Sequence, residues 1–270
     1  MKIISKKEIH NNNIFQKIFY CCAGGKENTP EVKFEHGMNS NLSDSKNSSI
    51  FDNIQKYIRP DEKDKIKFSK KGILDFINSL QNLEYSKKYQ SDIYNISIRD
   101  SSILSQDTLI LRFEAKIDKN MFNQKIPNIT ELFDAIKNPI NNLKWNIYNK
   151  EYTIIHSISD NADIVKKILV KQMNIIPEKE FFNKRIYFLN EGIVYFFTSS
   201  IPDTMFPPKD ENVRGLNYFE IMIIKENKYY FLFDIFQQRD IKMSIPQTVL
   251  MMNLPDKLRD YFDKLISFFN

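Results

Sequence analysis

The chain has 270 residues and a formal net charge of +5, and 42% of its residues are hydrophobic. This length suits one large domain or two small ones, and the modest, scattered charge does not indicate a nucleic-acid partner, although it permits attraction to an anionic surface. Cys21 and Cys22 are the only cysteines and are adjacent, so a disulfide framework is excluded and a reducing compartment fits best. No run approaches the ~20 apolar residues needed to span a bilayer, and the N-terminus lacks the apolar core of a secretory signal. We therefore expect a cytoplasmic protein that does not cross a membrane.

Residues 1–59 are predicted to form a flexible leader, because two Asn- and Ser-rich stretches in it are polar and non-periodic. Between these stretches, Ile14, Ile18 and Cys22 fall four residues apart, which indicates a short helix with an apolar face. Nearby lysines and the adjacent thiols are typical of an interfacial membrane anchor, with Cys21 and Cys22 as candidates for acylation. The alternative is a short helix that docks on the domain or on a protein partner.

Residues 60–270 are predicted to form one domain, because no linker or internal repeat divides them. Apolar residues at three- and four-residue steps predict helices over 50–58, 73–83 and 129–136. Asn128 or Thr130 can cap the last of these helices, and Pro139 ends it. Alternating apolar residues predict two strand pairs, 93–98 with 108–115 and 152–158 with 164–170.

The chain from residue 177 onward predicts a strand meander followed by a long helix. Four aromatic and β-branched runs cover 186–189, 193–197, 218–224 and 229–236. One apolar helical face is then formed by Leu254, Leu258, Tyr261, Phe262, Leu265, Ile266 and Phe269. These patterns predict an α+β fold in which a curved antiparallel sheet is closed by a C-terminal helix.

Four landmarks in this half of the chain share the order and spacing of a known family. They are Trp145-Asn146, Lys179 to Arg185 at an Arg-Asp-Phe-Val-x-x-Arg motif, Ser199, Ser200 and Pro202 followed by Val213-Arg214, and Asp240 to Pro246 at an Asp-x-x-Gly-x-x-Pro motif. In these features the chain resembles the START domain, the steroidogenic acute regulatory protein-related lipid transfer module. The resemblance implies a helix-grip fold, in which the sheet wraps around the C-terminal helix and leaves an apolar tunnel for a single lipid.

The chain also departs from the family pattern. Lys179-Glu180 replaces the Arg-Asp pair, and Met243 replaces the glycine of the turn, where a left-handed backbone is less comfortable. In sterol-binding members an acidic residue faces the second arginine of the motif, and a gap-free alignment places Lys167 there. We therefore expect Arg185 and Lys167 to form a cationic end of the tunnel that favours a phospholipid head group over a sterol.

The resemblance also implies which side chains contact the lipid. Arg185, Tyr187 and Leu189 share strand parity and should face the cavity together. The other predicted lipid-binding residues are Lys167, Phe196, Arg214, Tyr261, Leu265 and Phe269. The alternatives are a structural ion pair of Arg185 with Asp234 or Glu220, a structural pair for Arg214, and ordinary core packing for the helix residues.

The loop from Ser200 to Val213 is predicted to dock on a membrane and to gate the tunnel, because Met205, Phe206 and Lys209 give it an apolar tip and a basic residue. The alternative is a proline-stiffened loop that packs on its own domain.

Catalysis is not expected. The three histidines, His10, His36 and His156, are far apart, and the chain lacks a nucleophile elbow, a phosphate-cradling glycine loop and zinc-ligand spacing. No cofactor or metal is expected. Two functions remain: intracellular lipid binding and transfer with peripheral membrane association, or a structural or protein-interaction module that keeps the fold without a ligand.

Overall fold

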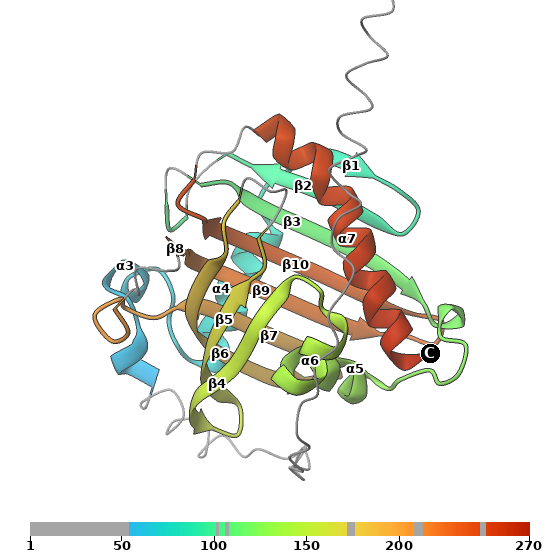
Figure 1. Cartoon of the computed structure of the whole chain (residues 1–270), viewed down its shortest axis with the longest axis horizontal. Helices are drawn as coiled ribbons and strands as arrows, with labels where there is room; N and C mark the ends of the chain where they lie inside the picture. Colours follow the sequence, from blue (N-terminus) through green and yellow to red (C-terminus); the bar gives the residue numbers. More distant parts are fainter. Residues whose placement is uncertain (1–53, 101–102, 106–107, 172–175, 208–212, 244–246) are drawn as a thin grey trace, which may run out of the picture.

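One antiparallel sheet carries the architecture. The structure, a computed structural model, describes residues 54–100, 103–105, 108–171, 176–207, 213–243 and 247–270. Within them, ten strands form one sheet in the order β1-β2-β3-β10-β9-β7-β6-β5-β4, and β8 pairs in parallel with β6 (Figure 1). The strands are β1 (Ser86–Gln90), β2 (Tyr94–Arg99), β3 (Ile110–Asp118), β4 (Asn149–Ser159), β5 (Ala162–Leu169), β6 (Lys179–Asn190), β7 (Ile193–Ser200), β8 (Val213–Arg214), β9 (Leu216–Glu226) and β10 (Tyr230–Asp240).

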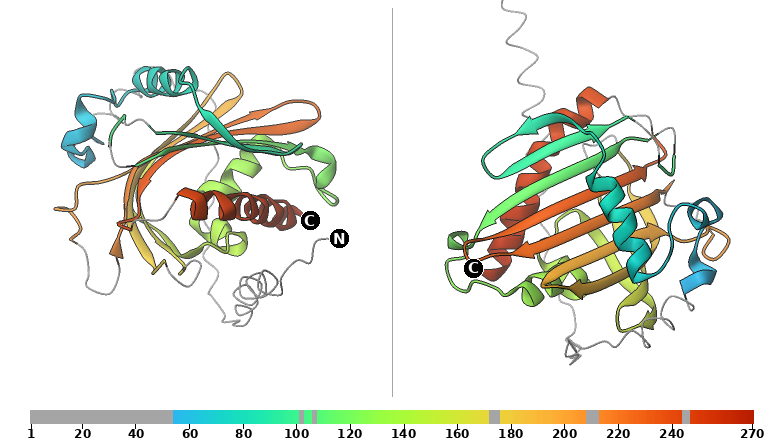
Figure 2. Two further views of the ribbon diagram at one scale, coloured as in Figure 1. Left: turned by 90° about the horizontal axis from the view of Figure 1, so that it is seen from above. Right: turned by 180° about the vertical axis from the view of Figure 1, so that it is seen from behind.

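Helices cover both faces of this curved sheet. The described helices are the 3-10 turns η1 (Gln55–Tyr57) and η2 (Lys119–Met121) and the α-helices α3 (Pro60–Lys63), α4 (Lys70–Gln81), α5 (Ile129–Lys137), α6 (Pro139–Trp145) and α7 (Gln247–Phe269). Figure 2 shows α7 lying within the concave side, near α5 and α6, while α4 crosses the convex side. This arrangement confirms the predicted α+β helix-grip fold.

Each face of the sheet has its own hydrophobic core. The concave core joins β2, β3, β6, β7, β9 and β10 to α5, α6 and α7. The convex core joins the other face of β3, β6, β7, β9 and β10, together with β5, to α4 and the segment that precedes it. Phe76 of α4, for example, meets Phe219 of β9 edge to face, with ring centroids 5.4 Å apart. Because both faces are buried, the central strands carry apolar side chains on both faces, and their charged residues are largely buried as well.

The ends of the helices follow local capping chemistry. Asn128, one of the two predicted caps, accepts hydrogen bonds from the backbone N–H groups of Thr130 and Glu131 at the start of α5. Pro139 ends α5 as predicted, but it also opens a second helix, α6, at a position where proline loses no intrahelical bond. The helix after Pro246 begins earlier than expected, at Gln247, and contains Pro255.

Two features were not predicted. Strand β1 has a mostly exposed sequence, Ser-Lys-Lys-Tyr-Gln, which is typical of a charged sheet edge and lacks alternation. Ile54, Tyr57 and Ile58, which fall within the predicted leader, are also buried in the convex core. Of the helix expected over 50–58, Ile54 is helical and Gln55–Tyr57 form the turn η1, while residues 50–53 lie outside the described residues.

A buried ionic cluster attaches α3 to the convex face. The ammonium of Lys184 and the carboxylate of Glu62 are both fully buried, with Nζ and Oε2 2.6 Å apart. Arg59 adds a second cation, 3.4 Å from Glu62, and donates to the carbonyl oxygens of Ser200 and Asn217. Burial lowers the pKa of Lys184 to about 8, against the opposing attraction of Glu62.

Removing the carboxylate at the centre of this cluster should be costly. Glu62→Gln leaves Lys184 buried without its ion-pair partner, while Arg59 keeps Asp61 at 3.0 Å, so we expect a loss of roughly 3–5 kcal/mol in the free energy of unfolding, measured by denaturant titration. The double variant Glu62→Gln/Lys184→Met should recover part of that loss. Glu178→Gln, at the exposed pair with Lys150, is the control and should cost less than about 1 kcal/mol. A small effect of Glu62→Gln contradicts the role of this cluster.

Candidate functional site

A row of polar residues crosses the concave face. Asp163, Arg185, Thr198, Glu220 and Gln237 lie directly opposite one another on β5, β6, β7, β9 and β10. Residues paired in register share one face of a sheet. Arg185 donates to the carbonyl oxygen of Lys137 at the end of α5, which places the row on the concave side. We call these five residues the polar row.

Arg185 is held tightly within the protein. Its Nε and Nη2 atoms donate to the two carboxylate oxygens of Asp163 at 2.6 and 2.5 Å, and Nη1 donates to Lys137 and to the Tyr152 hydroxyl. The side chain is 1% exposed. Burial disfavours the charged guanidinium, but Tyr152 and Asp163 outweigh that effect and raise the pKa of Arg185. The guanidinium is therefore permanently charged and paired.

The partners predicted for Arg185 are wrong. Asp163 faces it, whereas Lys167 lies opposite Phe181, further along the same strands. A gap-free alignment misplaced the pair because the spacing of residues along the chain does not reveal the register of β5 against β6. Neither alternative partner is correct either: Asp234 binds Arg112 at 2.9 Å, and Glu220 binds Arg239 at 2.7 Å.

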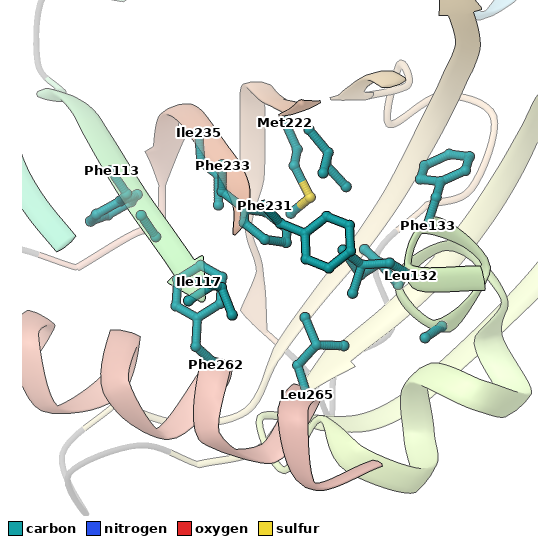
Figure 3. Packing of buried hydrophobic residues seen from close by; sticks show 14 of the residues in the cluster. Phe113, Ile117, Leu132, Phe133, Met222, Phe231, Phe233, Ile235, Phe262 and Leu265 are labelled. Carbon is teal, nitrogen blue, oxygen red and sulfur yellow. The ribbon is translucent and has the colours of Figure 1, made fainter. Parts of the chain in front are cut away.

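An aromatic cluster fills the concave side next to the polar row. Phe133 of α5 lies 5.7 Å from Tyr187 and 5.9 Å from Phe196, and Phe233 meets Phe262 of α7 at 5.1 Å between ring centroids. Figure 3 shows how residues from the strands, α5 and α7 point toward one another here. The predicted residues Tyr187, Phe196, Tyr261, Leu265 and Phe269 all belong to this cluster or pack against it.

Leu189 does not join them. It is 43% exposed and pairs with Val194 close to the β6–β7 turn. Strand parity predicts the face that a side chain takes, but not how far along the strand the covering helices extend. Its assignment to the cavity wall is therefore wrong.

Charged residues occupy the concave face on the other side of the polar row. The guanidinium of Arg239 lies 5.2 Å from the ring centroid of Phe181, and the ammonium of Lys167 lies 5.6 Å from that of Tyr152. Burial lowers the pKa of Lys167, against the attraction of Glu220. For Glu220, burial acts to raise the pKa, but Arg239 and Lys167 together lower it. Arg239 and Asp163 were not predicted as site residues from the sequence. A charged residue at an inward-facing position of an apolar strand could have identified them.

Tyr261 of α7 lies over this charged end. Burial raises the pKa of its phenol, and the negative charge of Glu220 raises it further. The ring also contacts Trp145 of α6 edge to face at 5.0 Å, and the Trp145 indole donates to the Ala135 carbonyl at 2.9 Å. The helix layer is thus fixed above both the charged and the aromatic parts of the concave face.

Arg214 forms structural pairs, which was the alternative interpretation. It donates to Glu180 at 3.0 Å, to Asp203 at 3.2 Å and to the carbonyl oxygen of Phe206 at 3.0 Å. Its guanidinium also covers the ring of Phe182 at 4.4 Å. Arg214 therefore fastens the loop that follows β7.

The two apolar residues of that loop differ in their environment. Phe206 stacks on Phe182, with ring centroids 4.9 Å apart and ring planes 7° apart, whereas Met205 is 37% exposed. Lys209, Cys21 and Cys22 lie outside the described residues. A split of roles within the loop follows: Phe206 fixes the loop, and Met205 presents an apolar side chain to the surroundings.

The turn after β10 is left-handed at Lys242, the residue before Met243. Lys242 has a φ of 53°, and its backbone N–H donates to Asp240 Oδ1 at 2.6 Å. This hydrogen bond supports a conformation that a non-glycine residue adopts at some cost.

A pocket of about 390 Å³ opens between α5, α6 and the end of α7. Phe133 and Phe269 form part of its wall, and Lys125, Glu131 and Lys137 are among its polar residues. Among the described residues, no group of His, Cys, Asp and Glu side chains is arranged to hold a metal ion. No helix in the described part of the chain is long and apolar enough to cross a membrane.

No family model and no curated protein matches the sequence. Solved structures do resemble it. Human StAR-related lipid transfer protein 5 aligns with a TM-score of 0.61 and 17% identity, over 73% of this chain and 93% of that one. Human STARD10 gives a TM-score of 0.57 at 13% identity, over 71% and 79% of the two chains. The human StarD13 (DLC2) lipid transfer and protein localization domain gives a TM-score of 0.54 at 10% identity, over 73% of this chain and 94% of that one.

At these identities the likeness concerns the fold. The chain has a helix-grip fold. More particularly, it has the fold of StAR-related lipid transfer domains, which confirms the resemblance found in the sequence motifs.

The Arg185–Asp163 pair should be a structural requirement. Asp163→Asn leaves a buried guanidinium without its counter-charge, so we expect a loss of roughly 3–5 kcal/mol in the free energy of unfolding. Asp234→Asn is the matched control, because Asp234 and Arg112 keep 19% and 20% exposure and solvent screens them. Equal losses from the two variants, measured by denaturant titration, contradict the assignment.

The two loop residues should respond differently to the same change. Phe206→Asp removes the stack on Phe182 and should cost about 2 kcal/mol, whereas Met205→Asp should stay within about 0.5 kcal/mol of the wild type. Thermal unfolding of both variants measures this difference. If Met205→Asp is as damaging as Phe206→Asp, Met205 is part of the packing and is not available for docking.

Proposed function

We propose that this protein binds a single lipid between the concave face of the sheet and α7 and transfers it between membranes, without catalysis. The amphipathic character of the concave side carries the proposal. Aromatic and aliphatic side chains line one part, and Lys167, Glu220 and Arg239 line the other beneath the same helix. A hydrophobic core usually holds charges only in close ion pairs, such as Lys184 with Glu62 in the convex core, whereas Lys167 has no ion pair within 4 Å among the described residues. The likeness to lipid transfer proteins in fold adds support.

The energetics suit a carrier. Burial of apolar surface stabilises a bound acyl chain by about 25 cal/mol per Å² relative to water. Relative to a membrane the chain gains little, because it leaves one apolar environment for another. Contacts with the head group and with the membrane surface must therefore set specificity and rate. The charged end of the concave face favours a phospholipid over a sterol, whose hydroxyl is neutral.

Membrane contact is assigned to the loop after β7. Met205 is exposed there, while Arg214 and Phe206 hold the loop in place. We propose peripheral and transient association at the cytoplasmic side of a membrane, with Cys21 and Cys22 as a second attachment point in the leader. A protein partner of the leader is the alternative use of that segment.

The competing function is a structural or interaction module without a ligand. Dense ring contacts among Phe133, Tyr187 and Phe196 favour it, because those side chains already satisfy one another. Native mass spectrometry of the purified full chain separates the two functions. A reproducibly bound lipid supports the carrier, and a protein that stays empty after incubation with vesicles supports the module.

Transfer should depend on Met205. Met205→Asp should lower the rate of phospholipid transfer between vesicles at least about fivefold, because a charge replaces the side chain that enters the interface. Leu189→Asp is the matched control, since Leu189 is similarly exposed but lies at the β6–β7 turn. Equal effects of the two substitutions contradict docking by this loop.

A further inference from the structure

Positive charge exceeds negative charge at one end of the concave face. Glu220 attracts both Arg239 and Lys167. Lys179 shares strand parity with Phe181 and extends the same end of β6. The acidic group that approaches Lys179 is Asp240, which already binds Lys242 at 2.7 Å. Among the described residues at this end, Lys167, Lys179 and Arg239 thus face one carboxylate that no other cation binds, that of Glu220, and Arg239 already pairs with it.

Several buried polar atoms at this end have no hydrogen-bond partner among the described residues. Asn217 is 0% exposed, yet neither its Oδ1 nor its Nδ2 is bonded. Three further buried atoms lack a hydrogen-bond partner: Arg239 Nε, Lys179 Nζ and Thr198 Oγ1. Each unsatisfied buried polar group costs about 1–3 kcal/mol, so native proteins keep few of them. A cluster of unsatisfied buried polar groups beside an excess of positive charge points to a ligand that would complete their hydrogen bonds.

An irregularity in β9 brings these atoms to one face. Asn217 pairs with Arg239 across a register shift, whereas Phe219 pairs with Gln238. Tyr218 and Phe219 both pack against the convex core. The extra residue therefore returns Asn217 to the concave side, next to Arg239 and the polar row.

Part of this group keeps some exposure inside the curve of the sheet, although Asn217 and Lys179 are buried. The side chains of Arg239 and Glu220 each keep 20% exposure. Lys167 and Tyr261 are also partly buried rather than fully buried. From Tyr261 the apolar face of α7 continues to Leu265 over the aromatic cluster. An elongated amphiphile lying along α7 can thus reach both environments.

We propose that Lys167, Arg239 and Asn217 bind the anionic phosphate of a phospholipid head group, with its acyl chains directed along α7 toward the aromatic cluster. This inference rests on the proposed lipid-binding function and names its ligand class. The ammonium of Lys167 and the free Nε of Arg239 supply charge-assisted donors, and the Asn217 amide supplies a neutral one. Glu220 orients Arg239 and limits the excess of positive charge. A lipid with net negative charge is therefore preferred over a zwitterionic one, and both are preferred over a sterol.

The test is a competition for lipid. The full chain is incubated with vesicles containing equal amounts of phosphatidylglycerol, phosphatidylcholine and cholesterol, isolated again, and its bound lipid is quantified by native mass spectrometry. We expect phosphatidylglycerol to be enriched about tenfold over phosphatidylcholine, which corresponds to about 1.4 kcal/mol. Lys167→Met should remove that enrichment. Glu220→Gln should increase it, because a negative charge is lost while the side chain keeps its shape.

Matched controls separate this site from charge effects elsewhere. Arg112→Met removes a guanidinium from a carboxylate pair of the same exposure on the convex face and should leave the enrichment unchanged, whereas Arg239→Met should lower it. Lys167→Met should unfold at the same temperature as the wild type or higher, because a buried ammonium without a close ion pair is removed. Because Glu220→Gln is expected to act in the opposite direction, loss of folding cannot produce the full pattern.

Each result has a definite meaning. Lipid that binds without preference, or with a preference that Lys167→Met leaves intact, overturns the head-group site but not the proposed function. A wild-type protein that takes up none of the lipids overturns the proposed function itself. Glycerol 3-phosphate provides the last arm: if it raises the unfolding temperature as much as phosphatidylglycerol does, the site binds free phosphate esters, and the assignment to a lipid is wrong.

Discussion

The pairing of Arg185 with Asp163 organises the inside of this fold. One guanidinium joins β6 to the neighbouring strand β5, to Tyr152 on β4 and to the last turn of α5. These bonds fix the position of α5 over the sheet, and with it Phe133 and the aromatic cluster. The pair is buried, so its charges are not screened by solvent, and loss of either partner affects every element that it connects.

The residue before Arg185 forms a similar buried ion pair on the opposite face of the sheet. Lys184 points into the convex core and meets Glu62, while Arg185 points into the concave one. Two adjacent cations are thus neutralised in two separate cores. Because a strand alternates its side chains, the sheet can hold ionic anchors for α3 and α5 almost back to back without mutual repulsion.

The sequence was most informative where a pattern repeats. Alternation and helical spacing located the central strands, α5 and the apolar face of α7, and the motifs around Trp145 and Arg185 pointed to the fold. Which residues pair across neighbouring strands was harder to predict. Asp163 was missed because the distance along the chain between β5 and β6 does not reveal their register, and the shift that places Asn217 beside Arg239 leaves no trace in the spacing of apolar residues.

The sequence also did not indicate how deeply individual side chains are buried. Leu189 and Tyr187 have the same parity, yet the more apolar Leu189 is exposed and Tyr187 is buried under α5. Likewise, Met205 and Phe206 are neighbours in one loop, and only the second stacks on the sheet. Such differences depend on where a distant helix ends or which ring lies nearby, and both are properties of the assembled chain.

The two edges of the sheet, β1 and β4, do not pair with each other. The sheet is thus an open trough and not a closed barrel, whose radius would be fixed by its strand number and stagger. A trough can flatten or curl by small changes of twist between neighbouring strands while every ladder hydrogen bond stays intact. The width of the space beneath α7 is therefore an elastic property of the sheet, set by how firmly the helices hold its two rims together.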